Sequence, residues 1–147
     1  MVEYQLLNTT DFVTTLEKEG IIGFLENNLD EYFDGRENVS RAIEYALSKF
    51  PHQGGFVLMA RKEGSIIGVS VVNRTNFEGY FAENMLVYLA VAEAERRIGI
   101  ASELLKQTKI YTKGDVMVRV AGHQIVRELF KKSGFDEGKS ELIFSRG

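Results

Sequence analysis

One stretch of the chain, residues 85–107, constrains the fold more than any other. It opens with MLVYLAVA, a continuous apolar run of strand length, which is typical of a strand buried on both faces of a sheet. Residues 93–98 are mostly charged and have no apolar period. Residues 99–107 then place Ala101, Leu104 and Leu105 at helical spacing. The stretch therefore predicts a buried strand, a polar loop and an amphipathic helix in succession.

The start of that helix has the features of a phosphate site. The first backbone N–H groups of a helix have no intrahelical partners, and the aligned peptide dipoles add partial positive charge there. Gly99 and Ala101 are small enough to let phosphates approach the backbone, and Arg96 and Arg97 supply full charges beside them. A solvated strand-to-helix turn of the same composition is the alternative.

Length and composition predict a single domain over residues 1–147, because 44% of the residues are hydrophobic and no linker or repeat interrupts them. Cysteine is absent, which removes disulfides, thiolate ligands and cysteine nucleophiles. Since there are only two histidines, we expect no metal site. The N-terminus lacks a basic region followed by an apolar core, and no apolar run is long enough to span a membrane. We therefore expect a soluble, cytoplasmic protein without membrane contact.

Charge is distributed unevenly along the chain. Residues 1–50 hold 10 acidic and 4 basic side chains, a net of −6, whereas residues 51–147 hold 11 acidic and 14 basic, a net of +3. This asymmetry suits an anionic ligand on the C-terminal half and a cationic amine near the N-terminal half. Ordinary surface charge is an equally good interpretation. No basic stripe interleaved with aromatics occurs, so we expect no nucleic-acid partner.

The N-terminal part predicts a strand over residues 2–7, followed by a helix capped by Asn8 or Thr9. We expect Gly20 and Gly23 to break or bend that helix. Residues 27–37 are acidic and predict a loop, and a second helix covers residues 38–49 until Pro51 ends it. The apolar face expected for the first helix contains Phe12, Val13, Leu16, Ile21, Phe24 and Leu25.

Residues 56–60 and 66–72 predict a hairpin, because both arms are rich in β-formers and the turn contains Gly64. After a loop over 73–82 and the central stretch, residues 115–120 predict a strand and residues 123–132 a helix. Phe135 and residues 142–145 predict a closing strand or hairpin. The order β-α-α-β-β-β-α-β-α-β indicates an α/β (α+β) fold in which helices flank a mixed, mostly antiparallel sheet.

The spacing Arg96-x-x-Gly99-x-Ala101, after a strand ending in Leu-Ala-Val, resembles the acyl-CoA-binding loop of the GNAT superfamily of N-acyltransferases. The predicted element order is similar to that family from end to end. The segment GHQIVRELFKKSGF also resembles the family's closing element, Asn-x-x-Ala-x-x-Phe-Tyr-x-Lys-x-Gly-Phe. In that element Lys132, Gly134 and Phe135 match, and Leu129 takes the Phe place.

The resemblance implies that acetyl-CoA is the co-substrate, without a metal. In the family, free backbone groups of the central strand bind the pantetheine arm and polarise the thioester carbonyl. Two departures occur: His123 replaces the usual Asn, and Phe130 replaces the Tyr that serves as general acid. We expect His123 to make the polar contact and Phe130 to pack beside the thiol. The strand residues implied are Leu89, Ala90 and Val91, and the pyrophosphate-binding amides are those of Arg97, Ile98, Gly99, Ile100, Ala101 and Ser102.

The implied reaction moves an acetyl group directly to a primary amine in a ternary complex, and the lack of cysteine excludes an acyl-cysteine intermediate. A lysine-like ammonium has a pKa of about 10.4, so it must first lose a proton. Glu83 is the first candidate base, through water, and an exposed strand-end carboxylate is its alternative role. Tyr88 is the second candidate, with core packing as its alternative.

The acceptor is predicted to be a small-molecule or peptide amine. The acidic residues Asp30, Glu31, Asp34 and Glu37 could attract a cationic acceptor, and Tyr32 or Phe33 could line its pocket. A homodimer is also possible. Two competing hypotheses remain open: a weak or inactive acyl-CoA-binding sensor of the same fold, which Phe130 favours, and an unrelated nucleotide-binding α/β domain. The hairpin before the phosphate loop argues against the latter.

Overall fold

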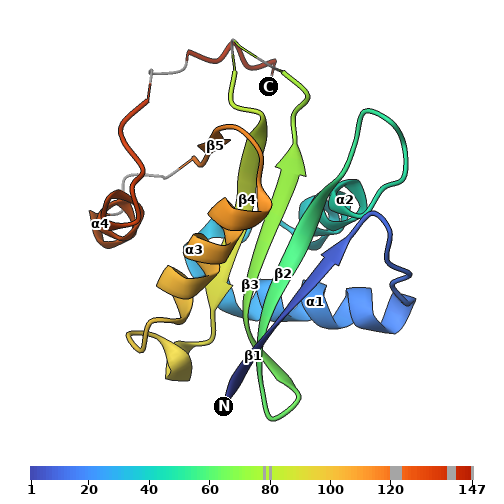
Figure 1. The fold of residues 1–147 in the computed structure, drawn as a ribbon, viewed down its shortest axis with the longest axis vertical. Helices are drawn as coiled ribbons and strands as arrows, with labels where there is room; N and C mark the ends of the chain where they lie inside the picture. The colour runs from blue at the N-terminus through green and yellow to red at the C-terminus, as the bar shows by residue number, and fades with distance from the viewer. Residues whose placement is uncertain (78, 80, 120–123, 139–141, 147) are drawn as a thin grey trace.

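The structure is a computed structural model that describes residues 1–77, 79, 81–119, 124–138 and 142–146. Its sheet has five strands in the order β1-β2-β3-β4-β5 (Figure 1). Neighbouring strands from β1 to β4 are antiparallel, whereas β4 and β5 are parallel. The sheet is therefore mixed and mostly antiparallel, as predicted. The strands are β1 Val2–Asn8, β2 Gly55–Lys62, β3 Ser65–Arg74, β4 Asn84–Val91 and β5 Val116–Met117.

Helices cover both faces of this sheet (Figure 1). The helices α1 (Thr15–Asn28) and α2 (Arg36–Ala46) pack on one face, and α3 (Ile100–Tyr111) and α4 (Gln124–Lys132) contribute to the other. Short 3-10 turns, η1 (Asp30–Tyr32) and η2 (Glu93–Glu95), follow α1 and β4. Each face has its own apolar cluster, one beneath α1 and α2 and one beneath α3. We call these sides the α1/α2 face and the α3 face.

The first helix begins later than predicted. Thr14 is its N-cap: its side chain accepts a hydrogen bond from the Glu17 N–H, and the Glu17 carboxylate returns to the Thr14 backbone. The prediction of a cap at Asn8 or Thr9 was wrong, because Asn8 instead closes a turn with Asp11. Leu16 lies on the far side of the helix from Ile21 and is 83% exposed, and Phe12, before the helix, is 89% exposed. Their assignment to the apolar face of the helix was therefore wrong, because both side chains face solvent.

The predicted break in α1 was also wrong, because the helix runs without interruption through Gly20 and Gly23. A glycine in a helix costs about 1 kcal/mol relative to alanine. Ile21, Ile22 and Leu25 are almost fully buried against the sheet, and burying each such side chain contributes about 1.5–3 kcal/mol. Tertiary packing therefore outweighs the local preference for a break.

Several other boundaries differ from the prediction. Helix α2 begins and ends earlier than residues 38–49, and α3 is longer than residues 99–107. Strand β5 covers Val116–Met117 of the expected 115–120, and the last of these positions lies outside the described residues. The described residues 142–146 form no strand, and Leu142, Ile143 and Phe144 are exposed, so the closing strand is not found in the described part of the chain. His123 lies outside the described residues.

A β-bulge in β4 decides which side chains face which helices. Val71 pairs with Tyr88 and Val72 with Leu86, so Val87 is an extra residue in β4. Residues two apart normally share a face, yet Leu86 lies in the cluster of the α3 face and Tyr88 in that of the α1/α2 face. The bulge therefore turns Tyr88 away from α3, and bulges of this kind are frequent beside active sites.

Candidate active site

The sheet opens between β4 and β5. In the described part of the chain, β5 pairs only with Asn84 and Met85 of β4. From Leu86 onward, β4 pairs with β3 on one side and has no strand partner on the other within the described residues. Main-chain groups on that side of Leu89 and Ala90 are thus available to an extended ligand, which could add to the strand edge by hydrogen bonding. The sequence predicted that these two residues and Val91 hold the pantetheine arm.

The turn after β4 ends at an uncapped helix N-terminus. Gly99 is the N-cap of α3, has φ 90°, and makes no side-chain capping hydrogen bond. The first backbone bond of the helix runs from the Glu103 N–H to the Gly99 carbonyl, at 3.0 Å. The amides of Ile100, Ala101 and Ser102 therefore precede the intrahelical bonds and have no partner within the helix. They point where the helix dipole favours an anion.

The two arginines of this turn occupy different environments. The Arg96 side chain folds back across the end of β4: its Nε donates to the Val91 carbonyl at 2.9 Å, and its Nη2 lies 3.1 Å from a carboxylate oxygen of Asp30. Arg97 is exposed, has φ 71°, and makes no hydrogen bond or ion pair with the described residues. Of the two charges predicted to face a phosphate, Arg97 is the one that is free to do so. A positive φ is uncommon in residues other than glycine, and Asp30, Glu63 and Asn76 also have one.

Tyr88 and Asp34 join the central strand to the loop before α2. The Tyr88 hydroxyl donates to the Asp34 carboxylate at 2.7 Å. Burial, followed by the hydrogen bond and the negative charge of Asp34, raises the pKa of Tyr88 far above its ordinary value. Tyr88 is therefore a neutral donor that orients a carboxylate, and it is unsuited to accept a proton. The arrangement fixes one exposed acid beside the bulge of β4.

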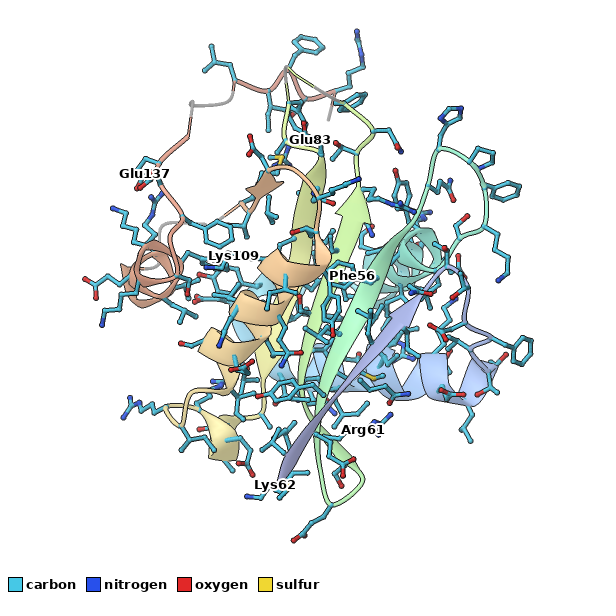
Figure 2. The ribbon with its side chains drawn as sticks, viewed as in Figure 1. Phe56, Arg61, Lys62, Glu83, Lys109 and Glu137 are labelled. Carbon is cyan, nitrogen blue, oxygen red and sulfur yellow. The ribbon has the colours of Figure 1, made fainter. Side chains whose placement is uncertain are left out.

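Glu83 lies just before β4, at the end of the strand opposite η2 (Figure 2). Its carboxylate accepts a hydrogen bond from the Asp115 N–H at 2.8 Å. This bond is the main cause that lowers the pKa of Glu83 below its ordinary value. A carboxylate that holds its proton less tightly is a weaker base, so the geometry gives Glu83 a clear role in joining β4 to the loop before β5. Its role as general base remains a prediction.

The other apolar residues predicted for the coenzyme site lie in the turn after β4 and in α3 and α4. Ile98 is 62% exposed beside Arg97, and Ile100 is buried in the cluster of the α3 face. Phe130 of α4 is buried in the same cluster, where its ring meets Phe135 edge-on at 5.2 Å. It brings no polar atom to the open edge of β4. Among the described residues, no group of three or more carboxylate or imidazole side chains could hold a metal ion.

The residues present fit a substrate with an anionic head and an extended arm. The anion would meet the amides of residues 100–102 and the Arg97 guanidinium, and the arm would continue along the open edge of β4. No helix in the described part of the chain has the length and apolarity required to cross a bilayer. An uncapped helix N-terminus beside an unpaired strand edge is an arrangement that can bind an anion.

Comparison with known families identifies the class of protein. Residues 15–135 match the Acetyltransferase (GNAT) family. Since the match covers most of the chain, the protein belongs to the GNAT acetyltransferase family. A search of curated protein sequences finds no significant match.

Solved structures share the fold across nearly the whole chain. One is the aminoglycoside N-acetyltransferase AAC(6')-Iy in complex with CoA, with a TM-score of 0.71 and 13% identity, covering 99% of this chain and 96% of the other. An acetyltransferase from Clostridium acetobutylicum with acetyl-CoA gives the same four values. A ribosomal-protein-alanine N-acetyltransferase from Brucella melitensis biovar Abortus 2308 has a TM-score of 0.68 and 14% identity, with 99% of both chains covered. At these identities the likeness establishes the fold.

Sequence reasoning did not anticipate two features of this site. It named Tyr88 and Asp34 separately, but no pattern links two residues 54 positions apart. It grouped Arg96 with Arg97, although only Arg97 lacks a protein partner in the described part of the chain. Asp30 could have indicated this difference between the two arginines, since its carboxylate pairs with Arg96.

Proposed function

We propose that the protein transfers an acetyl group from acetyl-CoA to a primary amine. The observation that carries the proposal is the continuity between the open edge of β4 and the uncapped start of α3. The amides of residues 100–102 and the Arg97 side chain would hold the pyrophosphate. Main-chain groups of Leu89, Ala90 and Val91 would hold the arm and polarise the thioester carbonyl. The Val91 carbonyl already accepts from Arg96, so Leu89 and Ala90 carry more of this role.

The chemistry proposed is direct aminolysis of the thioester. The amine nitrogen attacks the carbonyl carbon, a C–N bond forms, the C–S bond breaks, and coenzyme A leaves as its thiolate. If its thiol resembles a free cysteine, with a pKa of about 8.5, the thiolate departs near neutral pH without a positioned acid. This is consistent with Phe130 in the place of the family's tyrosine. Losing such an acid slows a reaction by about 10²- to 10⁴-fold without preventing it.

We further propose that Asp34 binds a cationic acceptor. Its carboxylate is held by Tyr88, which is adjacent to Leu89 in β4 and turned by the bulge onto the α1/α2 face. An ammonium group that approaches from this face would meet Asp34 next to the proposed position of the thioester. The nitrogen loses one proton before it attacks and a second after the C–N bond forms. Both pass to water or to a carboxylate, for which Glu83 remains the candidate. The acceptor class is thus a small molecule or peptide with a primary amine.

A thiol-release assay with acetyl-CoA over a panel of amines tests the activity, and calorimetry measures binding of acetyl-CoA alone. We expect release that depends on the amine. Asp34→Asn should raise KM for the amine about tenfold, because a charge-assisted contact is lost, and leave the Kd of acetyl-CoA unchanged. Glu37→Gln is the matched control, since it removes an acid from the same segment that pairs only with Arg41 among the described residues. Equal effects of the two substitutions would reject the role of Asp34.

One observation favours a second candidate, an acyl-CoA-binding module without turnover: Phe130 carries no hydroxyl to protonate the leaving thiolate. Tight binding of acetyl-CoA with no release for any amine would support this candidate and exclude the transferase. Absence of binding would exclude both.

A further inference from the structure

A hollow of about 510 Å³ lies at the end of the sheet opposite the start of α3. Its walls come from the end of β1, the start of β2, the end of β3, the start of β4 and the C-terminal end of α3. This volume lies within the range of small-molecule sites, which is about 300–1,000 Å³. The lining residues, all described, are Leu6, Asn8, Thr9, Thr10, Gly55, Phe56, Arg74, Asn76, Glu83, Asn84, Tyr111 and Lys113.

Two cations line this hollow without a partner among the described residues. In the described part of the chain, neither the Arg74 guanidinium nor the Lys113 ammonium makes a hydrogen bond or ion pair. By contrast, Arg36 pairs with two carboxylates, and Arg41 and Arg127 pair with others. Arg61 and Arg96 also donate hydrogen bonds to described residues, so Arg74 differs from these arginines in having no such partner.

The backbones of both cations are fixed. The Arg74 N–H donates to the Gly54 carbonyl at 2.8 Å, and its own carbonyl accepts from the Tyr45 hydroxyl at 2.7 Å. The Lys113 carbonyl accepts from the Asn84 side chain at 2.7 Å. A Cβ at Gly54 would lie 2.4 Å from Nη2 of Arg74, so the glycine leaves the space that the guanidinium occupies.

The rest of the lining supplies an apolar floor. Phe56 of β2 lies beneath α3 (Figure 2), and its ring meets Tyr111 edge-on at 6.1 Å. Leu6 adds an aliphatic surface. Glu83 is the one carboxylate among the described lining residues, and it is held by the Asp115 amide and forms no ion pair with either cation. The two positive charges are therefore not neutralised, whereas a second negative charge on a ligand would be repelled by Glu83.

We propose that this hollow binds a small organic carboxylate with a flat apolar body. The carboxylate would contact Arg74 and Lys113, and the apolar body would pack on Phe56 and Tyr111. The position of the carboxylate is separate from the proposed position of the thioester, because Asn84 begins β4 and Leu89 lies five residues further along, about 16 Å at the rise of a strand. Glu83, the candidate base, is the one residue named for both sites. The hollow also opens on the α3 face, since Phe56 belongs to that cluster, whereas Tyr88 and Asp34 meet on the α1/α2 side.

The test uses benzoate as the probe, with benzamide as its neutral isostere and phenyl phosphate as the dianion. Titrations followed by calorimetry and by NMR shifts should give saturable benzoate binding, with a millimolar Kd expected for so small a ligand. Benzamide should bind at least tenfold more weakly, and phenyl phosphate should also be weaker than benzoate. Equal binding of benzoate and benzamide, tighter binding of phenyl phosphate, or no saturable benzoate binding would overturn the proposal.

Variants locate the site. Arg74→Gln and Lys113→Gln should each weaken benzoate binding about fivefold to tenfold, while Lys106→Gln, an exposed cation elsewhere on α3, should not. Arg74→Lys keeps the charge without the planar fork and should recover part of the affinity. Thermal midpoints equal to that of the parent protein verify folding, since both cations are exposed and lack partners in the described structure. Benzoate binding unchanged in Arg74→Gln, or displaced by acetyl-CoA, would also reject the proposal.

Discussion

Arg96 and Arg97 are neighbours in the chain but have different physical roles. Arg96 joins the end of β4 to the region after α1, because its guanidinium contacts the carbonyls of Val91 and Asn28 and the carboxylate of Asp30. Arg97 turns out to solvent in a left-handed conformation. The first is a structural residue and the second a residue available to a ligand. Substituting the two arginines one at a time should therefore change different quantities, stability for Arg96 and ligand binding for Arg97.

We expect Arg97→Gln to weaken coenzyme A binding about tenfold, because one charge-assisted contact is lost. Its free energy of unfolding should change by less than about 0.5 kcal/mol, as for other surface substitutions. Arg96→Gln should instead lower that free energy by about 1 kcal/mol, since it removes protein hydrogen bonds. Calorimetry and urea unfolding measure the two quantities. A loss of stability in Arg97→Gln equal to that in Arg96→Gln would contradict this distinction.

Glu83 gives a pH-dependent prediction. Its pKa is lower in the folded protein than its ordinary value, chiefly because the Asp115 N–H bonds the ionised form. The contribution of Glu83 to stability is therefore present above its ordinary pKa and is lost as pH falls through its folded value. Glu83→Gln should be less stable than the parent at pH 7, and this difference should shrink as pH falls below the ordinary pKa of a glutamate.

Thermal midpoints across this pH range provide the measurement. Glu3→Gln is the control, because Glu3 is exposed and makes no hydrogen bond or ion pair within the described part of the molecule. A constant difference between Glu83→Gln and the parent at every pH would show that the Asp115 contact does not depend on charge.

At the scale of elements, the start of α3 offers a substitution with opposite effects on folding and binding. Ser102 is exposed in the first turn, where a carboxylate interacts favourably with the helix dipole. Ser102→Glu should leave the thermal midpoint unchanged or raise it, because such an acid contributes about 0.3–1 kcal/mol. The same charge would repel a pyrophosphate at this helix end and weaken coenzyme A binding by at least about tenfold.

Lys106→Gln changes the net charge of the same helix by the same amount, one turn further on. It should leave coenzyme A affinity nearly unaltered. If both variants weakened binding equally, overall charge rather than the start of the helix would be responsible.

Elements with strong local signals were predicted well, and those decided by tertiary contacts were not. The β2–β3 hairpin and the strand–turn–helix from β4 to α3 follow from apolar period and from glycine in the turns. The start of α1 was also readable, since Thr14 and Glu17 have capping-box spacing, but Asn8 and Thr9 were preferred. The continuity of α1 through Gly20 and Gly23 could not be read locally, because it depends on burial against the sheet.

The candidate site also has parts that could be predicted from local sequence and parts that depend on tertiary contacts. Gly99, Ala101 and the open amides follow from the spacing of one short segment. The bulge at Val87 lies within a uniformly apolar run that carries no local mark of an extra residue. Without the bulge, neither the direction of Tyr88 nor its bond to Asp34 could be derived. The hollow at Arg74 combines residues from five elements, so only the folded chain brings it together.

At the scale of the whole molecule, the sheet is continuous from β1 to β4 and opens beside β4. A ligand that binds in this opening recognises the folded state and not the unfolded state, so it should raise the free energy of unfolding. At one hundred times its Kd, acetyl-CoA should add about 2.7 kcal/mol to the free energy of unfolding. For a chain of this size, that corresponds to a rise of about 5–10 °C in the thermal midpoint.

Hydrogen exchange measured with and without acetyl-CoA shows which backbone amides the ligand protects. Amides of β4 beyond Met85 and those at the start of α3 should become protected, whereas the amides between β2 and β3 should be slow in both states. Benzoate should protect neither region of the coenzyme site. Protection confined to the region of Arg74 on adding acetyl-CoA would contradict the proposed binding mode.

The extra residue in β4 has a consequence for how this gene tolerates length changes. Deleting the single codon for Val87 would remove the unpaired residue while Leu86 stays opposite Val72 and Tyr88 stays opposite Val71. Tyr88 would therefore keep its side of the sheet and its bond to Asp34. A one-residue insertion here would instead add a second unpaired residue to the strand and should be more damaging. Among homologous chains, loss of this residue should accordingly be more frequent than loss of a regularly paired residue of β4.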